Sequence, residues 1–556
     1  MLCVAILAPA LALVYVLLVN AWIIDDAYIT FRSVANFVAG QGLRWNVDER
    51  VQVFTHPLWF FVVAALYGVT SEFYLTTLAA CLVCSLLAIG SLAAFATAGL
   101  RRDLWKVPLY CLILVSSKAV IDYASSGLEN ALSYLLAALF SICLLAERGR
   151  AESRLGWLTL LASLAFVNRQ DTLLLYAPAL AWWVASHGRT LPPRAWLRAG
   201  LATLPAVGWL AFSLFYFGYA VANTSYAKLT ATGFPAAWRW ERGLDYLRNS
   251  LEWDFPVYLL MATGIGLCLK RRRHALLALQ AGAVAYLAYA VLYAASATHL
   301  SGRFIALPLF LGSSLFVCAL DGRRWAGGIA VALLVFNLLN PAAAIKFGTR
   351  SYDSDVTLFR SRPLTLPERL AARSYIDAKS YIYPDYVPLV SNWRPGATYG
   401  PDNLWYQGGL QLRASPQRVH VGGFMNGEAV GYFGFAAGPE KFIVDRVGLT
   451  DPLLSKLPAI RPERIEEWKS GHFLRLIPFG YLESVAADRN LVEDPSLHAY
   501  YDKIRLVTRG PLLDRDRLRE IWKLNTGAYA PLIESYVANE VAARLRSRER
   551  REPAAR

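Results

Sequence analysis

Charged residues are scarce in this chain: Asp, Glu, Lys and Arg make up 17% of its 556 residues, whereas 56% are hydrophobic. This composition excludes an ordinary soluble enzyme, because such enzymes are less apolar. The scarcity is uneven, since residues 1–345 consist of repeated apolar runs and residues 346–556 have ordinary polarity. The sequence therefore predicts a transmembrane domain over 1–345 and a soluble domain over 346–556.

Cysteine is absent from the second part of the chain. All seven cysteines lie before residue 346: Cys3, Cys81, Cys84, Cys111, Cys143, Cys268 and Cys318. A domain without cysteine needs no disulfides, so cysteine usage does not locate the soluble domain. Cys81 and Cys84 have the spacing of a metal-binding pair, but they lie within an apolar run without a second pair or a nearby histidine. We interpret them as packing residues.

Several familiar motifs are missing as well. No Walker A, GxGxxG, HExxH or GxSxG motif and no zinc-binding Cys/His set occurs in a suitable context. The formal net charge of +15 does not indicate a nucleic-acid partner, because most clustered Lys and Arg residues lie in short loops between apolar runs. A pattern of this kind reports membrane topology instead.

The apolar runs that are present have membrane-spanning length or slightly less. They predict eleven spans, at roughly 4–22, 73–98, 105–121, 128–146, 155–168, 171–187, 197–217, 255–269, 275–296, 303–320 and 325–345. The run 57–70 is too short and directly follows a polar loop, so we predict a helix at the membrane surface within a first outer loop over 23–72.

Alternate loops between these spans carry the basic clusters. By the positive-inside rule the following loops are cytoplasmic: 101–106, 147–154, 187–198, 270–274 and 321–325. The other loops and the soluble domain then face the outside or the periplasm, with the N-terminus in the cytoplasm. The first span lacks a basic flank and a small-x-small cleavage site, so we interpret it as a retained helix rather than a signal peptide.

Ten ionisable residues collect at the outer ends of the spans and in the outer loops. They are Asp25, Asp26, Arg32, His56, Glu129, Arg169, Asp171, Lys228, His299 and Arg303. Carboxylates and cations at one membrane face suit a reaction between a lipid-linked phosphate and a hydroxyl acceptor, in which a carboxylate takes the proton and cations stabilise the phosphate. A nucleotide-sugar donor would instead bind on the cytoplasmic side, where this chain offers only short basic loops.

Each of these residues also has a structural interpretation. Arg169 and Arg303 are placed to snorkel from span ends, and Asp26 and Glu129 to cap the helices that follow them. Asp171 can form a purely structural ion pair with Arg169. The two histidines and Lys228 suit ordinary loop positions. From the residues alone, both interpretations stay open.

The order of motifs resembles the polyprenyl-phosphate-dependent membrane glycosyltransferases of the GT-C fold. In particular, the chain is similar to the terminal arabinofuranosyltransferase group of mycobacteria and its bacterial relatives. The matching stretches, which run through most of the chain, are IIDDAYITFRSVANFVAGQGLRWN, VFTHPLW, ASSGLENAL, VNRQDTLLL, NTSYAKL, HLSGRFIALPLFL, VDRVGLTDP and SGH. The resemblance implies a polytopic α-helical protein of GT-C type, with about 11 transmembrane helices and a C-terminal mixed α/β extracytoplasmic domain, in the bacterial inner (plasma) membrane.

The resemblance also implies a reaction. A sugar, D-arabinofuranose, passes with inversion from a polyprenyl-phosphate donor to a hydroxyl of a cell-envelope glycan or glycoprotein outside the membrane. Asp25 matches the first-loop aspartate, the general base or acceptor-binding carboxylate, and Asp26 matches its neighbour. Arg169 falls where relatives have Arg-Pro-Glu or Arg-Pro-Asp, although Gln170 replaces the proline here. Lys228 and Arg303 match positions assigned to the donor phosphate.

Further residues belong to the same list of implied contacts. Arg32, His56, Glu129, Asp171 and His299 are the remaining candidates for binding the donor phosphate or substrate. Three residues of the soluble domain belong to similar motifs with a structural or acceptor-facing role: Asp445, Asp451 and His472. Some enzymes of this fold use a divalent cation, and the sequence shows no convincing ligand set, so a metal requirement is left open.

Other functions remain open at this point. Another polyprenyl-phospho-sugar, such as mannose, would use the same fold. A lipid transporter would place ionisable residues in mid-span and show paired broken helices, whereas here the charges lie at span ends. A non-catalytic scaffold gives no reason for carboxylates and cations to collect on one face.

Overall fold

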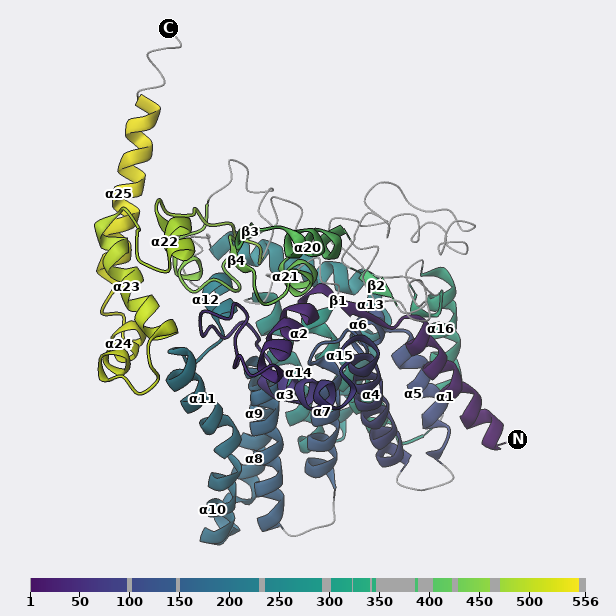
Figure 1. Ribbon diagram of the computed structural model, residues 1–556. Helices are drawn as coiled ribbons and strands as arrows, with labels where there is room; N and C mark the ends of the chain where they lie inside the picture. The colour runs from purple at the N-terminus through teal and green to yellow at the C-terminus, as the bar shows by residue number, and fades with distance from the viewer. Residues whose placement is uncertain are drawn as a thin grey trace. The chain divides into compact units, whose positions relative to one another are not determined.

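The computed structural model describes most of the chain before residue 347 and most of it after residue 403. The described residues are 2–97, 103–146, 151–229, 236–292, 302–322, 324–340, 343–346, 386–388, 404–422, 429–460 and 471–549. Helices dominate them, as predicted, and strands are short (Figure 1). The chain divides into two compact units, and each unit draws on several separate segments.

Unit 1 comprises Met1–Ala27, His56–Val207 and Pro235–Leu404. Two short strands, β1 (Trp22–Ile24) and β2 (Tyr386–Pro388), pair antiparallel within it. Its helices are α1 (Leu2–Val19), α3 (Pro57–Thr70), α4 (Tyr74–Thr97), α5 (Lys106–Val115), α6 (Lys118–Tyr123), α7 (Asn130–Leu145), α8 (Ala151–Asn168), α9 (Leu173–His187), α10 (Pro193–Ala202), α13 (Ala236–Lys270), α14 (His274–Leu292), α15 (Arg303–Ala319) and α16 (Ala326–Leu339).

Unit 2 comprises Tyr28–Thr55, Gly208–Phe234 and Trp405–Arg556. Two helices enter it from unit 1: α2 (Asp25–Val38) and α11 (Leu204–Phe217). Its other elements are α12 (Asn223–Leu229), α20 (Leu404–Ala414), β3 (Val419–Gly422), α21 (Val430–Ala437), β4 (Phe442–Asp445), α22 (Tyr481–Ala487), α23 (Pro495–Arg509), α24 (Arg515–Asn525) and α25 (Ala530–Glu549). Each unit therefore combines segments from different parts of the chain, and the predicted domain boundary near residue 345 stays a prediction.

Every predicted span contains a helix. Among the described residues, three helical segments are long and apolar enough to cross a membrane: Tyr74–Thr97, Pro193–Phe217 and His274–Leu292. Shorter apolar helices occupy several of the other predicted spans, such as α7 and α15. The helical membrane character is thus supported, while the number of eleven spans stays a prediction.

Basic loops meet one another within unit 1. Arg271 and Arg273, between α13 and α14, both form ion pairs with Asp321, which follows α15. Arg194 Nη2 at the start of α10 lies 2.8 Å from Glu152 Oε1 at the start of α8. The basic loops therefore meet in two pairs, and the common cytoplasmic side of all five stays a prediction.

The short helix α3 starts beside the loop 124–129. Trp59 Nε1, in its first turn, donates to Gly127 O at 2.9 Å. After three linking residues α4 begins, and its Cys81 Sγ already lies 3.9 Å from Leu128 O in the same loop. Cys81 lies about two turns into α4, so these contacts fit a hairpin of α3 and α4, and the interpretation of 57–70 as a surface helix stays a prediction.

The strand β1 docks along the same loop and sets the start of α2. Ile24 N donates to Ser126 O at 3.0 Å. Gly127 has φ +80°, and a Cβ there would meet the Ile23 side chain at 2.9 Å. Only glycine adopts this conformation without strain and lets the strand approach so closely. The chain is thereby guided to Asp25, where α2 begins.

Unit 2 is mostly helical in its described residues, around a two-stranded parallel sheet. Val419 of β3 pairs with Phe442 of β4, and Gly422 pairs with Asp445. Its apolar core joins this sheet to the helices α22 and α23 through buried residues such as Val444. The mixed α/β prediction for the soluble domain therefore corresponds here to one small sheet among many helices.

Candidate active site

One buried carboxylate of unit 1, Glu129, faces two arginines and a histidine. Arg169 Nη1 donates to its Oε1 at 2.6 Å, and Arg303 Nη2 lies 3.3 and 3.4 Å from its two oxygens. His56 Nδ1 lies 3.1 Å from Oε2. Glu129 is 1% exposed, so the loss of hydration has to be offset by these neighbours. The two arginines favour the ionised form of this carboxylate.

The two arginines extend the network to further carboxylates. Arg303 Nη1 donates to Asp26 Oδ2 at 2.6 Å. Arg169 grips Asp171 through Nε and Nη2, at 2.7 and 2.8 Å. Bidentate arginine–carboxylate pairs are strong and fix geometry. The structure thus brings together six of the predicted site residues, which we call the polar cluster: Asp26, His56, Glu129, Arg169, Asp171 and Arg303.

Local backbone structure explains why these side chains converge. Arg169 has an extended backbone at the end of α8, and a 3₁₀ turn, Gln170–Thr172, follows it. Arg303 is the first residue of α15, and its carbonyl accepts from Asn130 Nδ2 at 3.0 Å. Asn168 Nδ2 donates to Glu129 O at 3.1 Å. Two asparagines therefore fasten the three span ends that present the cluster.

The adjacent aspartates of α2 differ in their surroundings. Asp25 is buried, with 9% of its surface exposed, whereas the Asp26 side chain is 30% exposed and holds the bond to Arg303. Both lie in the first turn of α2, where the helix dipole favours negative charge. Asp26 is thus the aspartate that belongs to the polar cluster, and Asp25 stands beside it in the chain.

Arg32 has a different place from the predicted one. It lies in unit 2 and is 2% exposed. Its guanidinium donates to three backbone carbonyls, Trp45 O at 2.9 Å, Gly434 O at 2.6 Å and Lys441 O at 2.7 Å. These bonds tie α2 to the segments around α21 and β4. The contacts give Arg32 a structural role in unit 2, in place of the predicted donor-phosphate contact.

Two other predicted site residues belong to unit 2 or lie outside the described residues. Lys228 lies in α12 of unit 2 and is half-buried. His299 lies outside the described residues. Their assignment to the donor phosphate or substrate stays a prediction.

Aromatic residues complete the surroundings of the arginines, and sequence reasoning did not select them. The guanidinium carbons of Arg169 and Arg303 lie 4.7 and 5.6 Å from the ring centre of Phe304. Tyr286 OH lies 3.4 Å from Asp171 Oδ1. Tyr286 sits inside an apolar run and gave no signal, whereas Phe304 follows Arg303 directly within a quoted motif.

The cluster does not have the character of a metal site. Within the described ranges, no group of three or more His, Cys, Asp or Glu side chains is placed to hold a metal ion. Asp26, Glu129 and Asp171 each carry an arginine on a carboxylate oxygen that a cation would need. These residues fit an arginine network and do not fit a divalent cation.

Asp445 and Asp451, from the motifs of the predicted soluble domain, have structural contacts in unit 2. Asp445 accepts from Val447 N at 2.9 Å and Thr450 N at 3.1 Å. Asp451 Oδ1 accepts from Leu453 N at 3.0 Å, and both aspartates are 0% exposed. Burial, with Glu49 nearby, raises the pKa of Asp451 to about 8, although hydrogen bonds from the backbone and from the Tyr481 hydroxyl oppose the rise. Of the two roles left open, the contacts favour the structural one.

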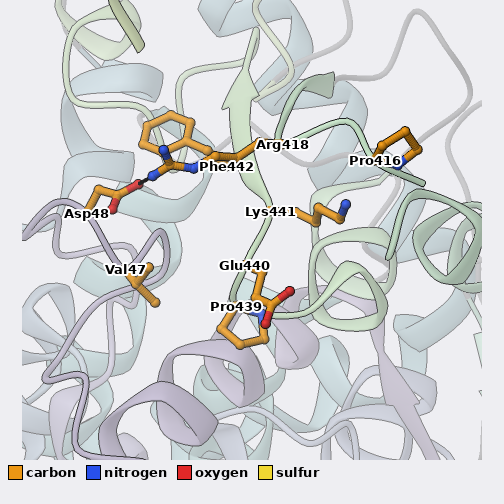
Figure 2. Close-up of a pocket in the computed structure, with 8 residues that line it drawn as sticks. All are labelled: Val47, Asp48, Pro416, Arg418, Pro439, Glu440, Lys441 and Phe442. Carbon is orange, nitrogen blue, oxygen red and sulfur yellow. Dashed lines mark hydrogen bonds and ion pairs between the residues drawn. The ribbon is translucent and has the colours of Figure 1, made fainter. Parts of the chain in front are cut away.

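Unit 2 also carries a charged surface cleft of about 440 Å³. Figure 2 shows the Arg418 guanidinium bonded to the Asp48 carboxylate, with the Glu440 carboxylate apart from them. Lys441 Nζ donates to Ser415 O and so holds the chain that leads to Arg418. The lining residues are Val47, Asp48, Pro416, Arg418, Pro439, Glu440, Lys441 and Phe442. Charges of both signs suit a hydroxyl-rich ligand better than an apolar one.

Comparison with curated proteins bears directly on the resemblance. A terminal beta-(1->2)-arabinofuranosyltransferase of Mycobacterium tuberculosis is 26% identical to this chain over 558 residues, which cover 87% of this chain and 85% of that protein. The predicted resemblance is confirmed. A protein of the same description from Corynebacterium glutamicum is 27% identical over 357 residues, which cover 56% of this chain and 50% of that protein.

The chain is a glycosyltransferase similar to these proteins, and the transporter and scaffold alternatives are set aside. No family model matches the chain. Among solved structures, a crystal structure of ArnT from Cupriavidus metallidurans in the apo state aligns with a TM-score of 0.48 and 14% identity, over 82% of this chain and 88% of that one. A likeness of this degree carries no argument about function.

Proposed function

We propose that this protein transfers D-arabinofuranose from a polyprenyl-phosphate donor to a hydroxyl of a cell-envelope glycan or glycoprotein. The reaction takes place at the outer face of the bacterial plasma membrane, in a GT-C fold. The named relatives support the choice of sugar. The polar cluster of unit 1 is the observation that carries the proposal, because it gathers arginines and carboxylates from span ends that a single outer face would hold.

The chemistry is a single displacement with inversion. The acceptor oxygen forms a bond to the anomeric carbon while the bond from that carbon to the phosphate oxygen breaks. Asp25 takes the acceptor proton as general base, and the polyprenyl phosphate leaves with one additional negative charge. Preorganised cations at the place where this charge develops lower the barrier.

Arg303 is the cation best placed for the phosphate. Two of its nitrogens bond to Asp26 and Glu129, while its buried Nε has no hydrogen-bond partner among the described residues. Arg169 uses all three nitrogens on Glu129 and Asp171. Arg303 therefore contacts the donor phosphate, and Arg169 holds Glu129 and the loop after α8 in position.

The acceptor is a polar polymer, and the cleft of unit 2 suits it. Asp48, Arg418 and Glu440 offer hydrogen-bond donors and acceptors to sugar hydroxyls. An apolar polyprenyl chain offers no hydrogen-bonding groups to such a charged lining. The cleft is therefore assigned to the acceptor glycan, separately from the donor.

A donor screen tests this function. Membranes carrying the protein are given polyprenyl-phosphate forms of arabinofuranose, mannose, glucose and aminoarabinose with one acceptor, and transfer is measured by mass spectrometry. We expect arabinofuranose to be transferred. Transfer of mannose alone would select the alternative sugar within the same fold, and no transfer from any lipid donor would contradict the proposal.

A further inference from the structure

Helix α24 of unit 2 presents apolar and basic side chains to the outside. Arg515, Leu518, Arg519 and Trp522 are spaced i, i+3, i+4 and i+7, so they share one face of the helix. Leu518 is 40% exposed and Trp522 is 72% exposed. Leu513, just before the helix, is 80% exposed. Large apolar side chains gathered in this way mark an interaction surface.

The opposite side of α24 is fastened to the end of α11, within the same unit. Arg517 Nη2 donates to Phe215 O at 2.8 Å and to Tyr216 O at 2.9 Å. Asn525 Nδ2 donates to Gly218 O at 2.8 Å. Figure 1 shows α24 beside this end of α11. Arg517 thus caps carbonyls that the last turn of a helix leaves without an internal partner.

That end of α11 is also the end of a candidate membrane span. The segment Pro193–Phe217 is one of the described helices that are long and apolar enough to cross a bilayer. The exposed side chains of α11 next to this end are apolar, with Phe212 and Leu214 among them. The hydrogen bonds from Arg517 and Asn525 therefore hold α24 at the height where the span leaves the hydrocarbon.

The side chains of the exposed face suit a position at the membrane interface. Tryptophan is enriched where the bilayer meets water, because its ring is apolar and its N–H is polar. Next to the exposed face, Asp516 pairs with Arg519 at 3.0 Å and Glu520 pairs with Lys523 at 3.2 Å. The face itself carries Arg515 and Arg519 and no acid, which complements the negative charge of anionic lipid headgroups. Helices with an apolar strip flanked by basic residues lie in the membrane interface.

We propose that α24, together with Leu513, docks on the lipid surface beside α11, with Leu518 and Trp522 in the interface and Arg515 and Arg519 on anionic headgroups. This contact ties unit 2 to the membrane independently of the sugar that is transferred. It requires only that Pro193–Phe217 spans the bilayer.

Photo-crosslinking of the full-length protein tests this contact. p-Benzoylphenylalanine is placed at position 522, and the protein is irradiated in vesicles of phosphatidylethanolamine and phosphatidylglycerol. The matched control carries the same group at position 479. Phe479 is 79% exposed and precedes α22, which Figure 1 shows away from the end of α11. Both substitutions replace one exposed aromatic group by another, so the fold is retained.

We expect several-fold more lipid adduct at position 522 than at position 479, by mass spectrometry of the crosslinked peptides. Equal lipid capture at both positions overturns the proposal, and so does capture of a polypeptide or glycan in place of lipid at position 522. Sugar transfer is measured on the same samples. Lipid capture without transfer contradicts the proposed function alone, and transfer without lipid capture contradicts the docking of α24 alone.

Discussion

Arg303 Nη1 donates to Asp26 Oδ2 at 2.6 Å, which ties the start of α15 to the start of α2. The two residues are far apart in the chain, and each lies in the first turn of its helix. The same guanidinium reaches Glu129. One arginine therefore holds together the loop that carries the proposed base and the loop that carries the most buried carboxylate of the cluster.

Replacement of Arg303 by lysine keeps the charge and removes the fork of donors. Lysine cannot bridge Asp26 and Glu129 while also facing the phosphate, because it is a point charge on a flexible stem. We expect kcat to fall by about 10²-fold, the usual effect of removing one preorganised donor. The measurement is steady-state transfer from a purified lipid donor.

The control for this variant is Arg271→Lys. Arg271 pairs with Asp321 in a basic loop, and its side chain is 36% exposed. We expect its kcat to stay within twofold of wild type. Equal losses in the two variants would mean that Arg303 acts through general stability rather than through the donor.

Asp25→Asn and Asp26→Asn separate the two aspartates of α2. Asparagine cannot take the acceptor proton, so Asp25→Asn is expected to lose about 10²- to 10⁴-fold in kcat with its thermal stability retained. Asp26→Asn keeps an oxygen for Arg303 and is expected to lose less. Turnover of each purified variant is the measurement, and near-normal turnover of Asp25→Asn would remove Asp25 from the mechanism.

Much of the polar cluster could be predicted because spans alternate in direction. Once the basic loops are set on one side, Asp26, Glu129 and Arg303 must lie at the other ends of their helices, and the structure brings them together. The charged residues at the span ends therefore indicated where the polar cluster lies. The partner of each side chain depends on helix packing angles, so the central position of Glu129 was not foreseen.

Arg32 shows where this reasoning fails. The sequence makes it a candidate for binding the donor phosphate or substrate because it lies just beyond a span end, among the charges of the outer side. However, α2 begins in unit 1 and continues into unit 2, and Arg32 bonds to Gly434 O and Lys441 O, far along the chain. Proximity in sequence does not reveal such long-range carbonyl contacts. A buried arginine that satisfies backbone carbonyls looks the same in sequence as one that binds phosphate.

The buried Asp451 predicts a pH dependence of stability. Its pKa is raised to about 8 from an ordinary value of 3.8, so the folded state binds a proton that the unfolded state releases. This contribution is fully present below pH 3.8 and is lost as the pH rises through about 8. The slope approaches about 1.4 kcal/mol per pH unit within that window.

Asp451→Asn tests this dependence, because asparagine keeps the oxygen that accepts from Leu453 N and Leu454 N. Unfolding free energies of both proteins are compared at several pH values between 4.5 and 8. We expect the wild type to lose stability relative to the variant as the pH rises. A constant difference would show that Asp451 is ionised in the folded protein throughout.

The cleft of unit 2 predicts an effect on the acceptor and none on the donor. In Arg418→Gln and Glu440→Gln, we expect the acceptor KM to rise several-fold for a long glycan, while the donor KM stays unchanged. Stability is preserved, because an exposed ion pair such as that of Arg418 with Asp48 contributes at most about 1 kcal/mol. Initial rates are measured with a disaccharide and with a longer glycan as acceptor. A change in the donor KM would contradict the assignment of the cleft to the acceptor.

Arg517 supports α24 through its backbone contacts, which gives the last prediction. It is fully buried, and besides the α11 carbonyls it bonds to Val507 O at 2.9 Å and Leu512 O at 3.0 Å. Arg517→Met leaves these carbonyls buried without partners, so we expect a loss of at least about 3 kcal/mol in unfolding free energy. The exposed Arg515→Met on the same helix should change it by less than about 0.5 kcal/mol. Lipid capture at position 522 should fall in Arg517→Met under conditions where the protein is still folded, because α24 is released from the end of α11. Undiminished capture in that variant would mean that the apolar face holds α24 at the membrane without these hydrogen bonds.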